Sequence, residues 1–472
     1  MPSATMPTSG RQQVIDPLVT SKKVLDELFG PPADRSFAVR LWDGTLQAPS
    51  SDDQVPFTIA INRPGALRRM LLPPSELAIG EAFLRNDFDV EGDLEDATAL
   101  ADQVVARLRS PVRLARVVSL LRDLPTDDLD PTHDEGATRS IGITGRRHSR
   151  LRDRAAVRSH YDVGNDFYSL WLDSRMVYSC GYFEDESVSL DDAQLAKLDL
   201  VCRKLRLSPG ERLLDIGCGW GSLVIHAASR YGVDATGITL SERQAELGRM
   251  RIAEAGLSDR CRVEILDYRE LPRDVSFDKI ASVGMVEHVG RTQLGRYFSE
   301  VYRLLRPGGL FLNHGIVELP AARKRGVSAL VTDAVWKPRS FLDRYVFPDG
   351  ELVPLAELIT SAESAGFETR DAESLREHYT LTLRHWVHRL EDHRAEACRL
   401  VGERTYRIWR LYMSGTARGF ATGRLNVVQT LLGKPDSGGH TVIPMTRNDL
   451  YSTCSMQGRD VEAGDPASHS RR

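Results

Sequence analysis

The sequence predicts an α/β protein whose main domain is a doubly wound, mostly parallel, Rossmann-like sheet, with a smaller N-terminal α+β domain before it. Two observations predict this fold. Between residues 160 and 320, short apolar segments alternate with runs that carry apolar residues at helical spacing. One of these segments, Arg212–Ile216, leads through a glycine-rich turn into a helical run. Sheets of this kind bind ligands at the carboxyl ends of their strands, so we expect the site there.

Composition limits the classes of function that the chain can have. Its 472 residues are enough for two or three domains. Lys and Arg total 62 against 66 Asp and Glu, and the net charge of −4 argues against a general nucleic-acid-binding protein. The six cysteines show no metal-ligand or disulfide spacing, which predicts reduced thiols in a cytoplasmic protein without a metal site. Residues 1–10 lack the apolar segment of a secretory signal and no apolar run reaches membrane-spanning length, so we expect neither a signal peptide nor a transmembrane helix.

The first 124 residues divide into a polar N-terminus and an accessory domain. Residues 1–20 are expected to be disordered because they are largely small and polar. Residues 21–124 contain predicted strands at 37–42 and 57–61 and helical patterns at 64–72, 74–86 and 96–109, with an acidic segment at 87–93. No catalytic cluster is recognisable in this domain, so scaffolding or substrate delivery is the better interpretation.

Residues 125–158 are predicted to be a linker with a basic second half. The arginines there are Arg146, Arg147, Arg150, Arg152, Arg154 and Arg158. A solvated charged hinge is the simpler interpretation. The alternative is contact with anionic lipid headgroups, to which each nearby cation contributes about 1 kcal/mol.

The main domain is predicted to span residues 159–433, followed by a polar, largely disordered tail at 434–472. Its predicted strands are 212–216, 234–238, 261–266, 279–283 and 310–314, and helical runs lie between them at 223–231, 241–255 and 293–305. Near its C-terminal end the main domain contains two more helical regions, from 375 to about 401 and from about 403 to 419. In the first of them apolar residues recur at Leu383, Trp386 and Leu390. Helices in such a place usually cap the core.

The glycine-rich turn, Gly217-Cys-Gly-Trp-Gly221, follows Asp215 on its strand. Glycines let the backbone approach a ligand, and the next helix offers unpaired N–H groups. A dinucleotide fingerprint would be Gly-x-Gly-x-x-Gly with an acidic residue about twenty positions on. Here the second strand ends instead in Gly237-Ile-Thr-Leu-Ser241.

The third strand ends at Asp267-Tyr268, where the carboxylate could accept a hydrogen bond from an adenine amine. Asp215 could instead cap its turn, and Asp267 could start a helix. Taken together, these residues resemble class I methyltransferases that use S-adenosylmethionine (SAM).

Seven longer motifs narrow the resemblance. They read HYDVGNDFY (160–168), MVYSCGYF (176–183), DIGCGWG (215–221), GITLSERQ (237–244), GMVEHVG (284–290), NHGI (313–316) and RYVFPDGE (344–351). In this order, between Arg158 and Gln429, they resemble the cyclopropane-fatty-acid synthase family, which includes mycolic-acid cyclopropane synthases and fatty-acid C-methyltransferases. The accessory domain is similar, through weaker motifs, to that of bacterial phospholipid-modifying synthases.

The resemblance implies methyl transfer from SAM to the cis double bond of an unsaturated phospholipid acyl chain. An alkene is a weak nucleophile, so the protein must position the reactants and exclude water. The attack leaves a carbocation, which the family deprotonates with a bound bicarbonate. Proton loss from the new methyl group gives a cyclopropane, whereas a hydride shift before proton loss gives a methylene branch. A fatty-acid C-methyltransferase of the family leaves a methylene- or methyl-branched chain. The sequence leaves this choice open, and a non-catalytic lipid-binding protein is the alternative from another class.

The resemblance also implies a cytoplasmic enzyme in peripheral contact with the inner face of the membrane, and a homodimer as in related bacterial synthases. The C-terminal helices would then either cap the core or roof the acyl channel and dock on the bilayer.

The resemblance assigns two sets of site residues. The bicarbonate site consists of Cys180, Glu287, His314, Ile316 and Tyr345. The SAM site consists of Tyr178, Ser179, Asp215, Gly217, Gly219, Gly221, Thr239, Leu240, Ser241, Gln244, Asp267 and Tyr268. Tyrosine and histidine side chains and backbone N–H groups can donate to the anion, and the glutamate can orient the site. Taken singly, a histidine at a strand end or a tyrosine among aromatic residues is more often a packed core residue.

Two positions depart from the family pattern. Family members commonly have threonine where this chain has Gly315, which would loosen the wall beside the anion. Some bacterial members carry a cysteine where this chain has Thr416. A thiol is unnecessary for alkene methylation, so the threonine argues only against covalent catalysis at that position.

Overall fold

The larger of two sheets carries the predicted parallel strands. In the computed structural model its seven strands run in the order β10-β11-β9-β8-β5-β6-β7. Strands β5 to β9 are mutually parallel, and β11 lies antiparallel between β9 and β10. The bounds are β5 Arg212–Ile216, β6 Asp234–Thr239, β7 Cys261–Ile265, β8 Phe277–Val283, β9 Leu305–Glu318, β10 Glu368–Ser374 and β11 Leu425–Gly433. The predicted doubly wound, mostly parallel sheet is therefore confirmed.

The structure describes a large part of the chain. The described residues are 16–50, 55–73, 75–126, 145, 147–161, 163–319, 341–441 and 443–451. The disorder predicted for most of residues 1–20 and for the end of the tail, and the acidic half of the predicted linker, lie outside these ranges. Among the described residues, no helix combines the length and the apolar character needed to cross a membrane.

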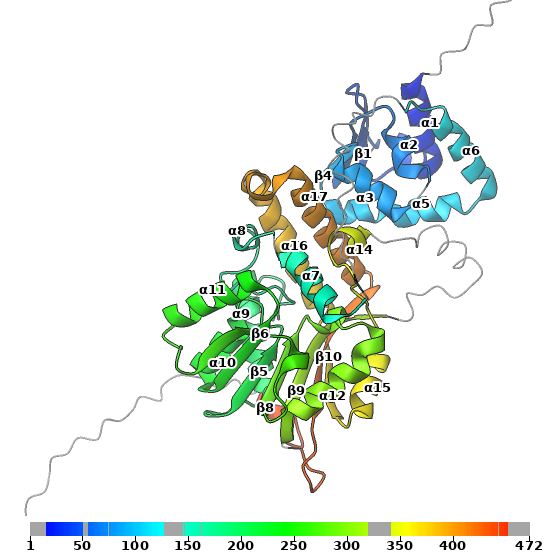
Figure 1. Cartoon of the computed structure of the whole chain (residues 1–472). Coiled ribbons are helices and arrows are strands. Elements are labelled where there is room, and N and C mark those ends of the chain that lie inside the picture. Colours follow the sequence, from blue (N-terminus) through cyan, green and yellow to red (C-terminus); the bar gives the residue numbers. More distant parts are fainter. Residues whose placement is uncertain are drawn as a thin grey trace, which may run out of the picture.

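Helices flank the large sheet, some of them connect its strands, and others lie between it and the N-terminal domain (Figure 1). They are α7 Arg150–Tyr161, α8 Asn165–Ser169, α9 Leu190–Leu205, α10 Ser222–Tyr231, α11 Glu242–Glu254, α12 Leu294–Leu304, α14 Phe341–Tyr345, α15 Leu355–Ser364, α16 Arg376–Asp392, α17 Arg394–Ala421 and α18 Asn448–Tyr451. The described part of the predicted tail is ordered in one respect: Leu450 of α18 is buried and Asp449 pairs with Arg206 at 3.0 Å.

The smaller sheet belongs to the N-terminal domain and has the strand order β2-β1-β3-β4. Its strands are β1 Ala38–Arg40, β2 Leu46–Gln47, β3 Phe57–Ile61 and β4 Phe88–Gly92, and its helices are α1 Pro17–Phe29, α2 Ala66–Leu71, α3 Glu76–Leu84, α4 Leu94–Thr98, α5 Leu100–Leu108 and α6 Pro111–Arg122. Strand β4 forms in the acidic segment, for which the sequence predicts no strand. Phe88 and Val90 alternate into the core there, while the acidic residues between and after them face outward or remain half-buried.

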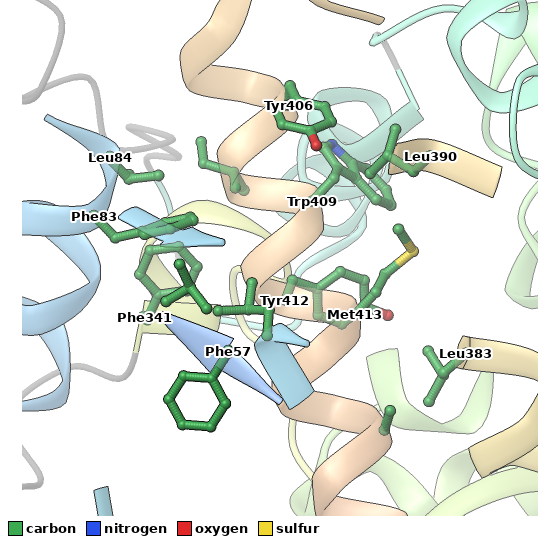
Figure 2. Packing of buried hydrophobic residues seen from close by; sticks show 14 of the residues in the cluster. Phe57, Phe83, Leu84, Phe341, Leu383, Leu390, Tyr406, Trp409, Tyr412 and Met413 are labelled. Atoms are coloured by element: carbon green, nitrogen blue, oxygen red, sulfur yellow. The ribbon is translucent and has the colours of Figure 1, made fainter. Parts of the chain in front are cut away.

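Helices α16 and α17 connect the two domains. Figure 2 shows Trp409, Tyr412 and Met413 of α17 between Phe83 and Phe341 on one side and Leu383 on the other. Two buried arginines of α17 extend this contact. Arg407 donates to the Phe83 carbonyl at 3.1 Å and to Asp89 at 2.6 Å, and Arg410 donates to Glu391 at 2.6 Å. These helices therefore do more than cap the sheet, because they also hold the N-terminal domain.

Candidate active site

Two cavities meet at the carboxyl ends of the parallel strands. The first cavity is formed mainly by the loops after β5, β6, β7 and β8 together with α7. The second cavity lies between the loop after β8, strand β9, α14, α16 and α17. Both are lined by Tyr161, Tyr178, Ser179, Gly284 and His288. A ligand in one cavity therefore lies against the same wall as a ligand in the other.

Ten of the twelve residues predicted for the SAM site line the first cavity. They are Tyr178, Ser179, Asp215, Gly217, Gly219, Thr239, Leu240, Gln244, Asp267 and Tyr268. The other two lie behind it and support its wall. Gly221 ends the turn at φ 82° before α10, and the Ser241 hydroxyl accepts from the Gln244 N–H at 3.3 Å to cap α11.

The glycine turn leaves an open face for a ligand. Gly217 and Gly219 have φ of 84° and 54°, a region that L side chains rarely adopt. A Cβ atom on Gly219 would meet nothing within 4 Å, so this side of the turn is open space. The Gly217 N–H bonds to the Ile238 carbonyl at 2.9 Å, which fixes the turn against β6.

Asp215 is a buried carboxylate of the first cavity with an unsatisfied oxygen. Its Oδ1 atom has no hydrogen-bond partner among the described residues, and burial raises the pKa of Asp215 to about 7. An unpartnered buried carboxylate is costly, so a ligand with a donor group at this point would be stabilised. The residue does not cap its own turn through this oxygen.

Asp267 lines the first cavity but is already paired. Both of its oxygens accept from Arg269, at 2.8 and 2.6 Å, and Arg269 also reaches Asp153 of α7 at 2.9 Å. A carboxylate has about four lone-pair positions, so a further hydrogen bond from a ligand amine is still available to it. Thr239 and Gln244 are joined by a 2.7 Å hydrogen bond at the same end of the sheet.

Helix α7 forms in the basic half of the predicted linker, where the sequence predicts no helix. Arg150 pairs with Glu270, Arg152 and Arg147 pair with Asp349, and Arg158 pairs with Glu242. Asp153, Val157 and Tyr161 of the same helix line the first cavity. These four arginines therefore have carboxylate partners within the chain, and α7 forms one wall of the site.

Four of the five predicted bicarbonate-site residues line the second cavity: Cys180, Glu287, His314 and Ile316. Glu287 accepts from the Ile316 N–H at 2.7 Å through Oε1, while its buried Oε2 has no partner in the part of the chain that the structure describes. Burial raises the pKa of Glu287 to about 7. The Ile316 N–H, expected to face an anion, is therefore engaged by Glu287.

His314 and Cys180 are both uncharged in this cavity. Burial, helped by the positive charges of Lys197 and Lys204, lowers the pKa of His314 to about 3. Its Nδ1 lies 3.2 Å from the side-chain amide of Gln429 on β11. Burial also raises the pKa of the Cys180 thiol, which donates to the Gly181 carbonyl at 3.2 Å. A neutral imidazole and a protonated thiol suit an environment that excludes water.

Tyr345 is not brought together with these four residues. Its hydroxyl donates to Glu81 of α3 at 3.0 Å, because α14 packs against the N-terminal domain through Phe341 beside Gly80. The structure instead places Tyr379 of α16 in the second cavity, together with Tyr412 of α17. The sequence held a signal for Tyr379, since it lies four and seven residues before Leu383 and Trp386 on the predicted apolar face.

Aromatic rings surround the wall between the cavities. The Tyr178 ring lies 5.2 Å from Trp386, 5.5 Å from Trp171 and 5.6 Å from Tyr168, measured between ring centroids. Its hydroxyl lies 3.3 Å from that of Tyr412. The faces of such rings attract cations, so this wall suits a ligand that carries or develops positive charge.

Comparisons with known proteins match both parts of the chain. Residues 148–430 match the family model for mycolic acid cyclopropane synthetase, and residues 24–105 match a domain of unknown function. A probable fatty acid methyltransferase of Pseudomonas putida is 40% identical over 430 residues, which cover 89% of this chain and 98% of that protein. A second probable fatty acid methyltransferase, from Mycobacterium tuberculosis, is 33% identical and covers 89% of this chain and 96% of its own length.

Solved structures match the larger domain. The mycolic acid cyclopropane synthase CmaA1, in complex with S-adenosylhomocysteine (SAH) and CTAB, is 34% identical with a TM-score of 0.55. The cyclopropane synthase MmaA2 from Mycobacterium tuberculosis is 32% identical, also with a TM-score of 0.55. Each match covers 60% of this chain and 98% of the other.

Proposed function

The chain belongs to the mycolic acid cyclopropane synthetase family of SAM-dependent methyltransferases, and from this premise we propose that it methylates the double bond of an unsaturated lipid acyl chain. The observation that carries the proposal is the pair of cavities joined at Tyr178 and Ser179. An alkene reacts only with a strong methyl donor held in line and shielded from water, and adjoining buried cavities provide that placement.

The first cavity fits SAM, which supplies an electrophilic methyl group when bound. Gly217 and Gly219 would let the backbone lie against the ligand, and Asp215 has a free buried oxygen for a donor group. Asp267 would accept from the adenine amine, and Tyr178 would turn its ring toward the positive sulfonium. The protein's own contribution is to orient the donor and exclude water.

We propose bicarbonate as the base, held in the second cavity. Glu287 has an unpartnered buried oxygen and a pKa near neutrality, so in its protonated form it can donate to an anion. His314 is neutral, and the hydroxyl of Tyr379 takes the donor role that the sequence assigned to Tyr345. A small anion in a largely apolar cavity would need such donors because an unpaired buried charge is costly.

Two products differ only in the fate of the carbocation. The primary proposal is a cyclopropane in a phospholipid acyl chain, formed by proton loss from the new methyl group. The second candidate is a methylene-branched chain, formed when a hydride shift precedes proton loss. It is favoured by the description of two relatives that cover 89% of this chain as probable fatty acid methyltransferases. The family resemblance supports three further proposals. The substrate is a phospholipid, the protein is cytoplasmic and contacts the inner face of the membrane peripherally, and it forms a homodimer.

Lipid analysis of a host that expresses the chain tests this function. We expect oleate-containing phospholipid to gain one CH2 group by mass spectrometry, and proton NMR to separate cyclopropane from vinylidene resonances. A Glu287→Gln variant is the matched control. If the protein bound SAH but left the lipids unchanged in the presence of SAM, the non-catalytic lipid-binding alternative would be favoured.

A further inference from the structure

Lys197 of α9 is a buried cation in the wall of the first cavity. The residue is only 2% exposed, and its ammonium donates to the Ser179 hydroxyl at 2.9 Å. In the part of the chain that the structure describes, this ammonium makes no ion pair. An ammonium has three donors, so two remain beyond the hydrogen bond to Ser179. Lys197 lies outside the seven motifs that carry the family resemblance.

The two carboxylates whose charges raise the pKa of Lys197, Asp173 and Asp215, form no ion pair with it among the described residues. Asp215 lies in the same cavity with Oδ1 unpartnered, beyond ion-pair distance from the lysine. Each residue shifts the other's pKa toward the charged form, while burial, the larger effect, shifts both toward the neutral form. Asp173 uses its two oxygens for the N–H groups of Val177 and Arg175, at 2.7 and 3.0 Å.

We propose that the Lys197 ammonium binds the carboxylate of the methionine part of SAM, with Asp215 facing the α-ammonium. This inference rests on the proposed function and deepens it. Two opposite buried charges that do not touch each other leave room for a zwitterion whose groups are complementary to both. Unpaired buried charges raise the free energy of the ligand-free protein, and binding of the zwitterion would lower it by pairing both groups.

The geometry favours the donor over the proposed bicarbonate as the partner of Lys197. Lys197 lines the first cavity and not the second, and Ser179 stands in the wall between them. A purely structural role would be to hold Ser179 in place. Gln194, one turn earlier on α9, already does so by donating to the Ser179 carbonyl at 2.7 Å. Lys197 therefore has donors that the protein alone does not need.

The test compares two nucleosides that differ in the amino-acid part. Isothermal titration of the full chain with SAH and with 5′-methylthioadenosine, which lacks that part, gives a ratio of affinities. We expect Lys197→Met to weaken SAH binding about 10- to 100-fold, in line with the loss of a charged hydrogen bond. Binding of methylthioadenosine should change less than about 2-fold. Lys197→Gln is the second variant, should the methionine variant fail to fold.

Lys204→Met is the matched control, because Lys204 is a buried lysine of the same helix that pairs with Glu373 outside both cavities. It should leave the ratio unchanged. On the ligand side, decarboxylated SAM should bind the wild-type protein more weakly than SAM and should bind both Lys197 variants as well as it binds the wild type. Equal weakening of SAH and methylthioadenosine, or none of either, would overturn the carboxylate contact. Failure of the wild type to bind either nucleoside would instead remove the donor site and the proposed function together.

Discussion

The hydroxyl of Tyr178 lies 3.3 Å from the hydroxyl of Tyr412. Tyr178 belongs to the wall shared by the two cavities, and Tyr412 belongs to α17, the helix that carries Arg407 to the N-terminal domain. The contact therefore connects the Tyr178 ring, which lies beside the proposed methyl donor, to a helix that packs against both domains.

Removing this hydroxyl should affect turnover more than binding. We expect Tyr412→Phe to lower kcat about 10-fold. The Tyr178 ring would lose the hydrogen bond that fixes it, which contributes about 1 kcal/mol, and the reaction rate depends strongly on how the reacting groups are positioned. SAH affinity should stay within about 2-fold, since the adenosine contacts are elsewhere. Tyr406→Phe on the same helix is the control. A larger loss of SAH binding than of kcat would contradict this role.

The second prediction separates two tyrosines. Tyr379→Phe should reduce turnover by about 10-fold or more and weaken its dependence on added bicarbonate, because the variant lacks a donor in the second cavity. Tyr345→Phe should leave the bicarbonate dependence unchanged and cost about 1 kcal/mol of stability, through the lost bond to Glu81. Steady-state kinetics at several bicarbonate concentrations distinguish them. The reverse pattern would restore the assignment that the sequence favoured.

The different positions of Tyr345 and Tyr379 show which parts of the site can be predicted from the sequence alone. The local pattern predicts the strands on or beside which Asp215, the glycine turn and His314 lie, and the structure contains both strands. Tyr345 and Tyr379 lie on helices whose orientation depends on packing with distant elements. For α14 that element is α3 of the N-terminal domain, some 260 residues earlier.

The same reasoning explains two other failures of prediction. Strand β10 reads ETRDAES, a polar edge strand without the apolar alternation that marks strands, and it forms because β11 pairs with it. The arginines of α7 look like a free basic segment because their partners, such as Glu270 and Asp349, are 120 to 197 residues away in sequence. Local patterns predict strand ends and turns, but they do not predict pairs that only the folded chain creates.

The third prediction concerns pH. The pKa of Glu287 is raised by burial from 4.5 to about 7, so between these values the folded protein binds a proton that the unfolded chain releases. The free energy of unfolding should therefore fall as pH rises from about 5 to 7, by about 2 kcal/mol from this residue. Glu287→Gln should remove this contribution. Denaturant titrations at pH 5 and pH 8 measure it as the difference between variant and wild type.

Asp215 titrates in the same direction, because burial raises its pKa to about 7, so both proteins should retain a slope from that residue. The comparison isolates Glu287 because the two residues lie in different cavities. An identical pH dependence in the two proteins would mean that Glu287 stays ionised in the folded state. It would then be unable to donate to the proposed anion.

The fourth prediction concerns the interface between the domains. Arg407 is 3% exposed and bonds to Asp89, Asn86 and the Phe83 carbonyl. Arg407→Ala should destabilise the protein by about 3 kcal/mol, because it leaves the buried carbonyl unsatisfied and Asp89 with a weaker partner. Arg399→Ala is the control. Among the described residues that exposed side chain pairs only with Glu396, three residues away, so the substitution should cost less than about 0.5 kcal/mol. Thermal and denaturant unfolding measure both.

The Arg407 variant should also lose activity at temperatures where it is still folded. Helix α17 places Tyr412 and Thr416 in the second cavity, so a loosened interface would move side chains at the proposed acyl site. SAH binding should fall less than turnover, because α17 does not line the first cavity. If turnover per folded molecule were unchanged, the N-terminal domain would be attached to the catalytic domain without influencing it, and the link through Tyr178 and Tyr412 would be only structural.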